Sequence, residues 1–268
     1  MPRFGFVTLM TDFGERDHYV GAVKGSILSI NPDATILDIT HDIAPHDVKE
    51  AAFTLLGYAS TFPFRTTHMV IVDPGVGTAQ KPLLVVTDNY YYLAPDNGVL
   101  SYVLEREEIE RIVPLEEDHF FRKPVSPTFH ARDIYGSVAG WLSRGDTDTS
   151  NFGPLVDSCT RWEIPKPRLL GDKLLKGHVL HIDRFGNIIT NISREQFEER
   201  VKKKPKAKPK VILATKEIPE MVKTYGEGKS PMFFLFGSTG FLEIASRERS
   251  VAESVNITVG KDVGLMFE

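Results

Sequence analysis

The spacing of hydrophobic residues predicts alternating strands and helices over residues 1–162. Short apolar runs bounded by turn residues predict buried strands, and apolar residues three or four positions apart predict the inner faces of helices. The runs that predict strands are 4–9, 35–39, 69–72, 83–86 and 90–93, and helical spacing runs through 20–30, 48–59 and a segment that begins near Arg132. The last two strands flank Asp88 and Asn89, which favour a hairpin. This alternation is typical of an α/β fold with a mainly parallel sheet flanked by helices.

The pattern changes after Trp162. Pro165 and Pro167 favour extended backbone, so residues 163–175 are expected to form a linker. Beyond it the apolar segments are short and predict strands, with one short helix that Ser193 is suited to cap. The predicted strands are 178–182, 187–192, 210–214, 232–236, 241–245 and 263–267. Residues 176–268 are therefore expected to form a small antiparallel barrel or sandwich.

Composition restricts the classes of partner. The formal net charge of -4 gives no electrostatic reason to expect nucleic acid or an anionic membrane, and the lysines between 202 and 210 are interpreted as a solvated loop. No apolar run approaches the roughly 20 residues of a membrane-spanning helix, and charged residues interrupt the N-terminal region where a signal peptide would need an apolar run. Cys159 is the only cysteine, so no intrachain disulfide is possible and a cytoplasmic protein is the simplest expectation.

The segment Asp73-Pro74-Gly75-Val76-Gly77 is the strongest candidate for a functional site. It follows the apolar run 69–72, so a strand would fix the carboxylate, and the glycines would let the backbone approach a ligand closely. Taken alone, Asp-Pro-Gly is equally good turn chemistry. Two further polar segments favour the functional interpretation, namely Thr11-Asp12-Phe13-Gly14 after the first strand and Thr128-Phe129-His130-Ala131-Arg132-Asp133 before a helix.

Asp12 and the segment after Asp183 have residue types suited to binding a nucleoside. Ligands of α/β folds bind at the carboxyl ends of strands, where the Asp12 carboxylate can accept hydrogen bonds from both hydroxyls of a ribose. Asn187 can donate to and accept from an adenine edge, and Phe185 can stack on the ring. The alternatives are structural: a helix N-cap at Asp12 or Asp17, and an ordinary turn at 185–187.

Other common chemistries lack their motifs. The sequence has no Walker A loop, no GxGxxG after the first strand, no GxSxG elbow, no HExxH and no paired CxxC. Asp12, His41, Asp73 and His130 have side chains that ligate metals, but their scattered spacing is a weak signal. No metal and no cofactor is therefore expected.

These motifs resemble those of the S-adenosylmethionine (SAM) hydroxide adenosyltransferases, also called SAM hydrolases, which are related to fluorinase and chlorinase. The resemblance runs nearly end to end and includes Phe185-Gly186-Asn187-x-x-Thr190-Asn191 and Gly240-Phe241-Leu242-Glu243-Ile244-Ala245. It implies an α/β N-terminal domain, a C-terminal antiparallel β-barrel, and a homotrimer. In that trimer the sites would lie between the N-terminal domain of one subunit and the C-terminal domain of its neighbour.

The resemblance also implies catalytic roles. Asp73 and His130 fall on two members of the family's water-activating Asp-Arg-His set. The position of the family's arginine is occupied by Gln80, and this departure leaves open whether Gln80, Lys81 or Arg132 takes the role.

The remaining matched positions imply contacts with the substrate. Around the reacting C5′ atom and the ribose, Val76 and Phe129 fall on the pocket wall, Asp12 on the ribose hydroxyls, and His46 beside the ribose and sulfonium. Around the methionine portion, Asp17 and Tyr19 fall nearby, Asp183 on the amino group, and Ser238 on the carboxylate. Phe185 and Asn187 fall on the adenine pocket, and the backbone near Glu248 falls on adenine.

The expected reaction is displacement at C5′ of SAM by water or hydroxide, which gives adenosine and L-methionine. The sulfonium is already a good leaving group, so the demanding part is the nucleophile, which Asp73 and His130 would activate as orienter and base. The alternatives are a halide-using relative, a regulatory module that binds SAM or adenosine, and a metal-dependent phosphohydrolase.

Overall fold

The computed structural model describes residues 5–268, which form two compact units divided between Glu163 and Ile164. Phe4, with which the first predicted strand begins, lies outside the described residues. The short strand β7 (Arg168–Leu170) lies within the segment expected as a linker and pairs with β8 (Leu174–Ile182).

The first unit is built on a six-stranded sheet with the order β2-β1-β3-β5-β4-β6. Strands β1, β2, β3 and β5 run parallel, and β4 pairs antiparallel with both β5 and β6, so the mainly parallel sheet is confirmed. The β4–β5 hairpin is confirmed as well, whereas β6 was not predicted, because exposed Glu110 and Arg111 interrupt its apolar pattern. The strands are β1 (Phe6–Thr11), β2 (Thr35–Thr40), β3 (Thr67–Ile71), β4 (Pro82–Thr87), β5 (Tyr91–Pro95) and β6 (Ile109–Pro114).

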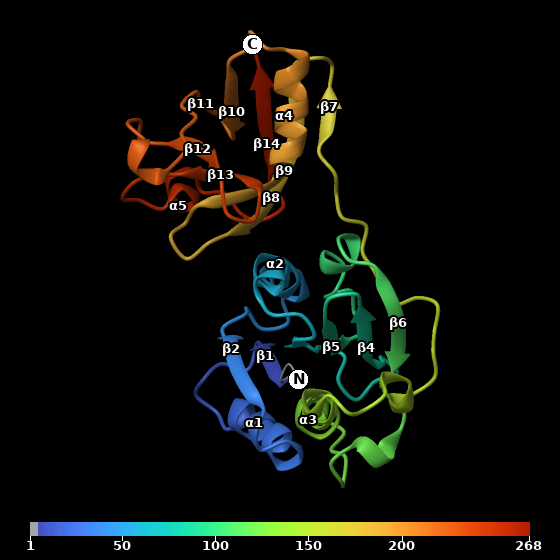
Figure 1. Ribbon diagram of the computed structural model, residues 1–268. Coiled ribbons are helices and arrows are strands. Elements are labelled where there is room, and N and C mark those ends of the chain that lie inside the picture. The colour runs from blue at the N-terminus through green and yellow to red at the C-terminus, as the bar shows by residue number, and fades with distance from the viewer. Residues whose placement is uncertain (1–4) are drawn as a thin grey trace. The chain divides into compact units, whose positions relative to one another are not determined.

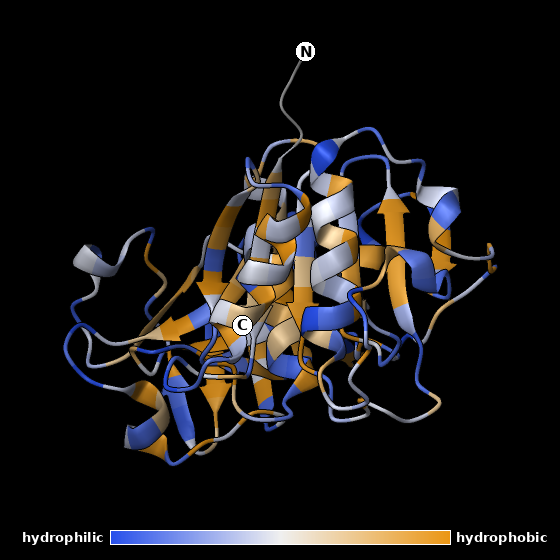
Figure 2. Cartoon of the chain, turned by 90° about the horizontal axis from the view of Figure 1, so that it is seen from below, coloured by the Kyte–Doolittle hydropathy of each residue, from blue (hydrophilic) through white to orange (hydrophobic). Residues whose placement is uncertain are grey.

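Helices cover both faces of this sheet. Helices α1 (Tyr19–Ile30) and α3 (Gly136–Arg144) lie on one face, and α2 (Val48–Tyr58) lies on the other (Figure 1). In β3 and just beyond it, Met69 and Ile71 pack in the core under α1 and α3, while Val70 and Val72 pack in the core under α2. Because helices cover both faces, the central strands are buried, and hydrophobic stretches stand out in Figure 2, whereas the edge strand β2 and the start of the edge strand β6 are partly exposed.

The helix expected near Arg132 begins as a π-helical turn, Ala131–Tyr135, and continues as α3. Such turns are frequent at functional sites. Asp17 does not cap α1. The N-cap residue of this helix is His18, which makes no side-chain capping bond. Short 3₁₀ segments occur at Ala59–Thr61, Val103–Glu105, Asp118–Phe120, Thr149–Phe152 and Tyr225–Glu227.

The second unit is an eight-stranded antiparallel sheet that nearly closes into a barrel. The predicted cap of α4 (Arg194–Lys203) is confirmed, because Ser193 and Gln196 form a reciprocal capping box. Phe197 of α4 packs in the core with Phe236 and Phe267. Besides β7 and β8, the elements are β9 (Ile188–Ser193), β10 (Pro209–Leu213), β11 (Lys216–Ile218), β12 (Phe233–Phe236), β13 (Phe241–Ala245), α5 (Val251–Val255) and β14 (Asp262–Phe267). None of the helices described between residues 5 and 268 is long and apolar enough to cross a membrane.

Candidate active site

A cavity of 330 Å³ lies beside the residues that follow β1 and β3. Its position agrees with the general location of ligand sites in α/β folds, at the carboxyl ends of parallel strands. Five residues expected from the sequence line it: Tyr19, Asp73, Val76, Phe129 and His130. The other lining residues are Phe13, Ile71, Ser126, Thr128, Ala131 and Arg132.

Asp73 is held at the edge of β3 by two donors on the same oxygen. Gln80 Nε2 donates to Asp73 Oδ1 at 2.5 Å, and the Gly75 amide donates to the same atom at 3.2 Å. Burial raises the pKa of Asp73, although the hydrogen bonds from Gln80 and Gly75 and the charge of His130 oppose the rise. A half-buried carboxylate with a raised pKa at the edge of a cavity is suited to take part in proton transfer.

Gly77 lets the two loops beside the cavity approach each other. Its φ of 79° lies in the left-handed region, and a Cβ there would come within 2.5 Å of the Pro127 carbonyl oxygen. Any other residue would therefore be strained and would separate the loop after β3 from the loop that carries Phe129 and His130. This explains why a glycine stands two positions after Gly75 in the motif.

Asp12 is anchored next to this cavity, although it does not line it. Its side chain is only 10% exposed, and its Oδ2 accepts a hydrogen bond from the His46 amide at 2.9 Å. His46 has a φ of 68°, a conformation that costs a non-glycine residue about 1–3 kcal/mol and that points to a constrained turn. The His46 ring is 75% exposed and borders a separate, open depression with Trp162.

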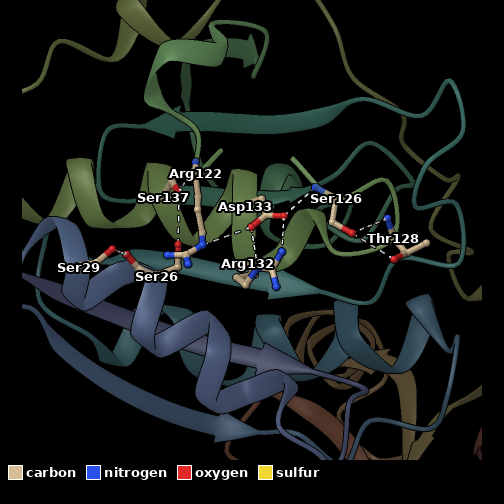
Figure 3. A network of polar contacts seen from close by, with 8 residues as sticks. All are labelled: Ser26, Ser29, Arg122, Ser126, Thr128, Arg132, Asp133 and Ser137. Carbon is tan, nitrogen blue, oxygen red and sulfur yellow. Dashed lines mark hydrogen bonds and ion pairs between the residues drawn. The ribbon is translucent and has the colours of Figure 1, made fainter. Parts of the chain in front are cut away.

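The loop that carries His130 is braced by a buried ion pair (Figure 3). Arg132 donates from Nε and Nη2 to the two carboxylate oxygens of Asp133 at 2.6 and 2.8 Å, and the Ser126 amide donates to Asp133 Oδ2 at 2.8 Å. Asp133 is fully buried; burial raises its pKa, but the hydrogen bonds from Arg132 and Ser126 outweigh burial and hold the pKa below its usual value. The pair therefore ties residues 126–133 into one rigid segment.

Aromatic rings form an apolar wall of the cavity. Tyr19 meets Phe129 edge to face with 5.3 Å between ring centroids, and Phe13 lies 6.3 Å from Phe129. The Arg132 guanidinium lies 4.9 Å from the centroid of the Phe129 ring. Asp17, which was expected near the same part of the site, is exposed and does not line the cavity.

The expected adenine-binding residues of the second unit lie on the turn between β8 and β9. Asp183 Oδ1 accepts from the amides of Phe185 at 2.9 Å and Asn187 at 2.8 Å, and Asn187 Nδ2 donates to Asp183 Oδ2 at 2.9 Å. The turn interpretation therefore explains why an aspartate stands at position 183 and why Asn187 donates from Nδ2 to it. It does not account for Phe185, whose side chain is held out on a rigid turn and is 77% exposed.

The other second-unit candidates lie on neighbouring loops. Ser238 is exposed in the turn between β12 and β13, and Glu248 is exposed just before α5. Helix α5, which follows Glu248, contacts the β8–β9 turn, because the Ala252 amide donates to the Gly186 carbonyl oxygen at 3.1 Å. Sequence reasoning gave no role to Glu243, which is buried next to Gly237 and accepts a hydrogen bond from the Tyr225 hydroxyl at 2.6 Å. A charged residue between Leu242 and Ile244 in a buried strand was the available signal.

Sequence reasoning also gave no site role to Phe13, Ser126 or Thr128, although all three line the cavity. They stand in or beside the motif segments, but their spacing does not say which way their side chains point. Within residues 5–268, no group of three or more His, Cys, Asp or Glu side chains is arranged to hold a metal ion.

Comparisons with known proteins agree with this architecture. The (R)-S-adenosyl-L-methionine hydrolase of Methanocaldococcus jannaschii is 35% identical over 97% of this chain and 95% of its own length. A fluorinase from an Actinoplanes species is 28% identical over 74% of this chain and 76% of its own length. The crystal structure of an uncharacterized conserved protein from Thermotoga maritima superposes with a TM-score of 0.89 and 32% identity, covering 97% of this chain and 99% of that chain.

Two domain families match the chain in the expected order. Residues 7–153 match the SAM hydroxide adenosyltransferase N-terminal domain, and residues 177–264 match the corresponding C-terminal domain. The resemblance inferred from the motifs is thereby confirmed, and the chain belongs to the SAM hydroxide adenosyltransferase family.

Proposed function

We propose that this protein hydrolyses SAM to adenosine and L-methionine. The observation that carries the proposal is the convergence of Asp73 and His130 on one cavity, at the carboxyl ends of the parallel strands, in a chain of this family. The relatives named SAM hydrolase match nearly the whole chain, which supports the same chemistry here.

In the proposed reaction a water oxygen attacks C5′ from the side opposite the sulfur. The C5′–O bond forms as the C5′–S bond breaks, and the electron pair of the broken bond stays on sulfur as the thioether of methionine. His130 accepts the proton that the water loses, and Asp73 orients His130 and stabilises its charged form. A positioned base contributes about 10²–10⁴-fold, and holding the water in line with C5′ and sulfur contributes a further proximity effect.

The remaining candidates are proposed as substrate contacts. The Asp12 carboxylate would accept hydrogen bonds from the ribose hydroxyls, and the exposed Phe185 ring would stack on adenine. We assign the rest as follows: Val76 and Phe129 to the wall around C5′, Asp17, Tyr19, Asp183 and Ser238 to the methionine portion, His46 to the ribose and sulfonium, and Asn187 with the backbone near Glu248 to adenine.

We further propose that the protein is a cytoplasmic homotrimer whose sites are shared between subunits. The family resemblance and the division of candidate residues between two units support the shared site. Light scattering would measure the trimer. A sharper test is co-expression of His130→Ala with Phe185→Ala, assayed at low SAM concentration. Shared sites would restore activity, because some sites in mixed trimers combine two unaltered domains. Activity no higher than that of the separate variants would contradict sharing.

Product analysis tests the reaction itself. Purified protein incubated with SAM should release adenosine and methionine in equal amounts, with no effect of EDTA. The 28% identical fluorinase makes halide transfer the alternative, so parallel reactions contain fluoride or chloride. A 5′-haloadenosine or methylthioadenosine as the main product would contradict hydrolysis. Tight binding of SAM without turnover would indicate a regulatory module instead.

A further inference from the structure

Asp73 has one oxygen occupied and one open. Both donors that reach its carboxylate, the Gln80 side chain and the Gly75 amide, bind Oδ1. The described residues offer no hydrogen bond to Oδ2. The carboxylate plane is therefore fixed by its two contacts, while the second oxygen remains available to a group in the cavity that Asp73 lines.

Gln80 is held against Asp73 by the backbone of the motif. A Cβ on Gly75 would lie 2.7 Å from Gln80 Oε1 and 2.9 Å from its Cδ, so the amide plane lies directly over the Gly75 Cα. The loop is held by internal hydrogen bonds. The Thr78 hydroxyl donates to the Gly75 carbonyl oxygen at 2.7 Å and accepts from the backbone amide of Gln80 at 3.3 Å. The absence of a side chain at Gly75 is what admits the Gln80 amide.

The nearby cations are bound elsewhere. Lys81 Nζ forms an ion pair with Glu116 at 2.9 Å. Arg132 is the one lysine or arginine that lines the cavity in the described part of the chain, and two of its nitrogens are bound to Asp133. Asp73 thus has a neutral amide as its side-chain hydrogen-bond partner, and the positive charge of Arg132 is compensated by Asp133.

We propose that Gln80 is a positioning residue that fixes Asp73 through Oδ1, leaves Oδ2 free to orient His130, and leaves the cavity without an uncompensated cation. The water therefore enters neutral and loses its proton during attack, and anions such as chloride are not drawn to Asp73. This inference rests on the proposed function. It assigns to Gln80 a role that acts through Asp73 and not on the substrate.

Gln80→Met tests the hydrogen bond with little change in volume. We expect kcat to fall about tenfold, the size of one hydrogen bond to a charged group, with the KM for SAM unchanged. Because the lost bond favours the ionised carboxylate, the pKa of Asp73 should rise, and the acid limb of the kcat profile should move up by about one pH unit. A residue that only supports folding would not move that limb.

Two further variants separate this role from a general loss of structure. Gly75→Ala should displace the unaltered Gln80 amide and shift the acid limb in the same direction, and the Gly75→Ala/Gln80→Met double variant should equal Gln80→Met alone. Lys81→Met is the matched control, and its kcat, KM and pH profile should match the wild type. Gln80→Arg should create chloride inhibition that the wild type lacks, because it places a cation beside the open oxygen.

The decisive measurement is a carbon NMR titration of the Asp73 carboxyl in the substrate-free protein, run beside the kinetics. An Asp73 pKa that is the same in the wild type and Gln80→Met, with an unmoved acid limb, overturns the inference even if the wild type hydrolyses SAM. So does a Lys81→Met variant as impaired as Gln80→Met. A wild type that leaves SAM intact overturns the proposed function, and the NMR titration still decides whether Gln80 controls Asp73.

Discussion

The two units carry different kinds of candidate residues. In the first unit, Asp73 and His130 line a cavity, and their loops are locked by the Gln80 hydrogen bond and the Arg132–Asp133 ion pair. In the second unit, the side chain of Phe185 is 77% exposed on a turn locked by Asp183. The first arrangement suits proton transfer, which needs groups held in fixed geometry and partly shielded from water. The second suits stacking on a planar ring.

This contrast supports the proposal that the catalytic pair Asp73 and His130 belongs to the parallel-sheet unit and the stacking residue Phe185 to the barrel. The physical reason is the location of polar groups. Strands buried on both faces end in loops whose side chains converge at one sheet edge, as Phe13 after β1 and Asp73 after β3 do at the cavity. Hairpins of an antiparallel barrel instead project outward, which exposes side chains such as Phe185 to a ligand. If this division is right, variants of Asp73 and His130 should change kcat, and variants of Phe185 should change KM.

The largest effect is expected for Asp73→Asn. The amide keeps the shape of the side chain but cannot stabilise a charged His130, so kcat for SAM hydrolysis should fall about 100-fold or more while KM changes little. Steady-state kinetics measure both constants. Asp88→Asn, at an exposed position in the β4–β5 hairpin, is the matched control and should behave as the wild type. An Asp73→Asn enzyme that retains kcat but binds SAM weakly would move this residue from catalysis to recognition.

A smaller effect, on KM and not on kcat, is expected for Phe185→Ala. Base stacking on an aromatic side chain is worth about 1–3 kcal/mol, so KM should rise about tenfold with kcat nearly unchanged. Phe185→Trp should retain the low KM because it keeps a stacking surface. Phe64→Ala removes a ring of the first unit that is 71% exposed and serves as the control for loss of an exposed aromatic. A fall in kcat with unchanged KM would contradict the division of roles.

The smallest effect concerns stability at low pH. His68 is fully buried under the rings of Tyr58 and Tyr90, with Nδ1 2.8 Å from Thr8 Oγ1, and burial lowers its pKa to about 3. The unfolded chain takes up a proton near pH 6.5 and the folded chain does not, so the free energy of unfolding should fall as pH drops from 6.5 toward 3. The slope approaches about 1.4 kcal/mol per pH unit.

Hydrogen exchange resolved by unit measures this loss. Amides of β3 should lose protection between pH 7 and 5 more than amides of β9, because the two histidines of the second unit, His178 and His181, are only half-buried. Burial lowers the pKa of His178 against the opposing charge of Asp262. His68→Gln should flatten the pH dependence in the first unit, whereas His119→Gln, at an exposed histidine, should leave it unchanged. Equal acid sensitivity of both units would remove this difference between them.

Much of the fold could be predicted from the sequence. Strands buried on both faces are largely apolar, as residues 69–72 are, and the first backbone amides of a helix need acceptors, which Ser193 supplies in the capping box of α4. Strands with several exposed residues were harder to predict. The strands β6 and β7 were not predicted, because exposed side chains interrupt their hydrophobic pattern. Motifs close in sequence to strand ends predicted a site at the carboxyl ends of the strands, and Asp73 lines a cavity there.

What the sequence determined by itself was therefore most of the order of elements, the family and five of the residues that line the cavity, since these depend on local patterns and motif spacing. The tertiary structure alone decided which side chains meet. The sequence left open whether Gln80, Lys81 or Arg132 takes the role of the family's arginine. In the structure the loop after β3 places Gln80 on Asp73, while Glu116 and Asp133 bind the other two. The reason is geometric: the path of a loop and the burial of a distant carboxylate set which donor reaches which acceptor, and neither is encoded in the spacing of residues along the chain.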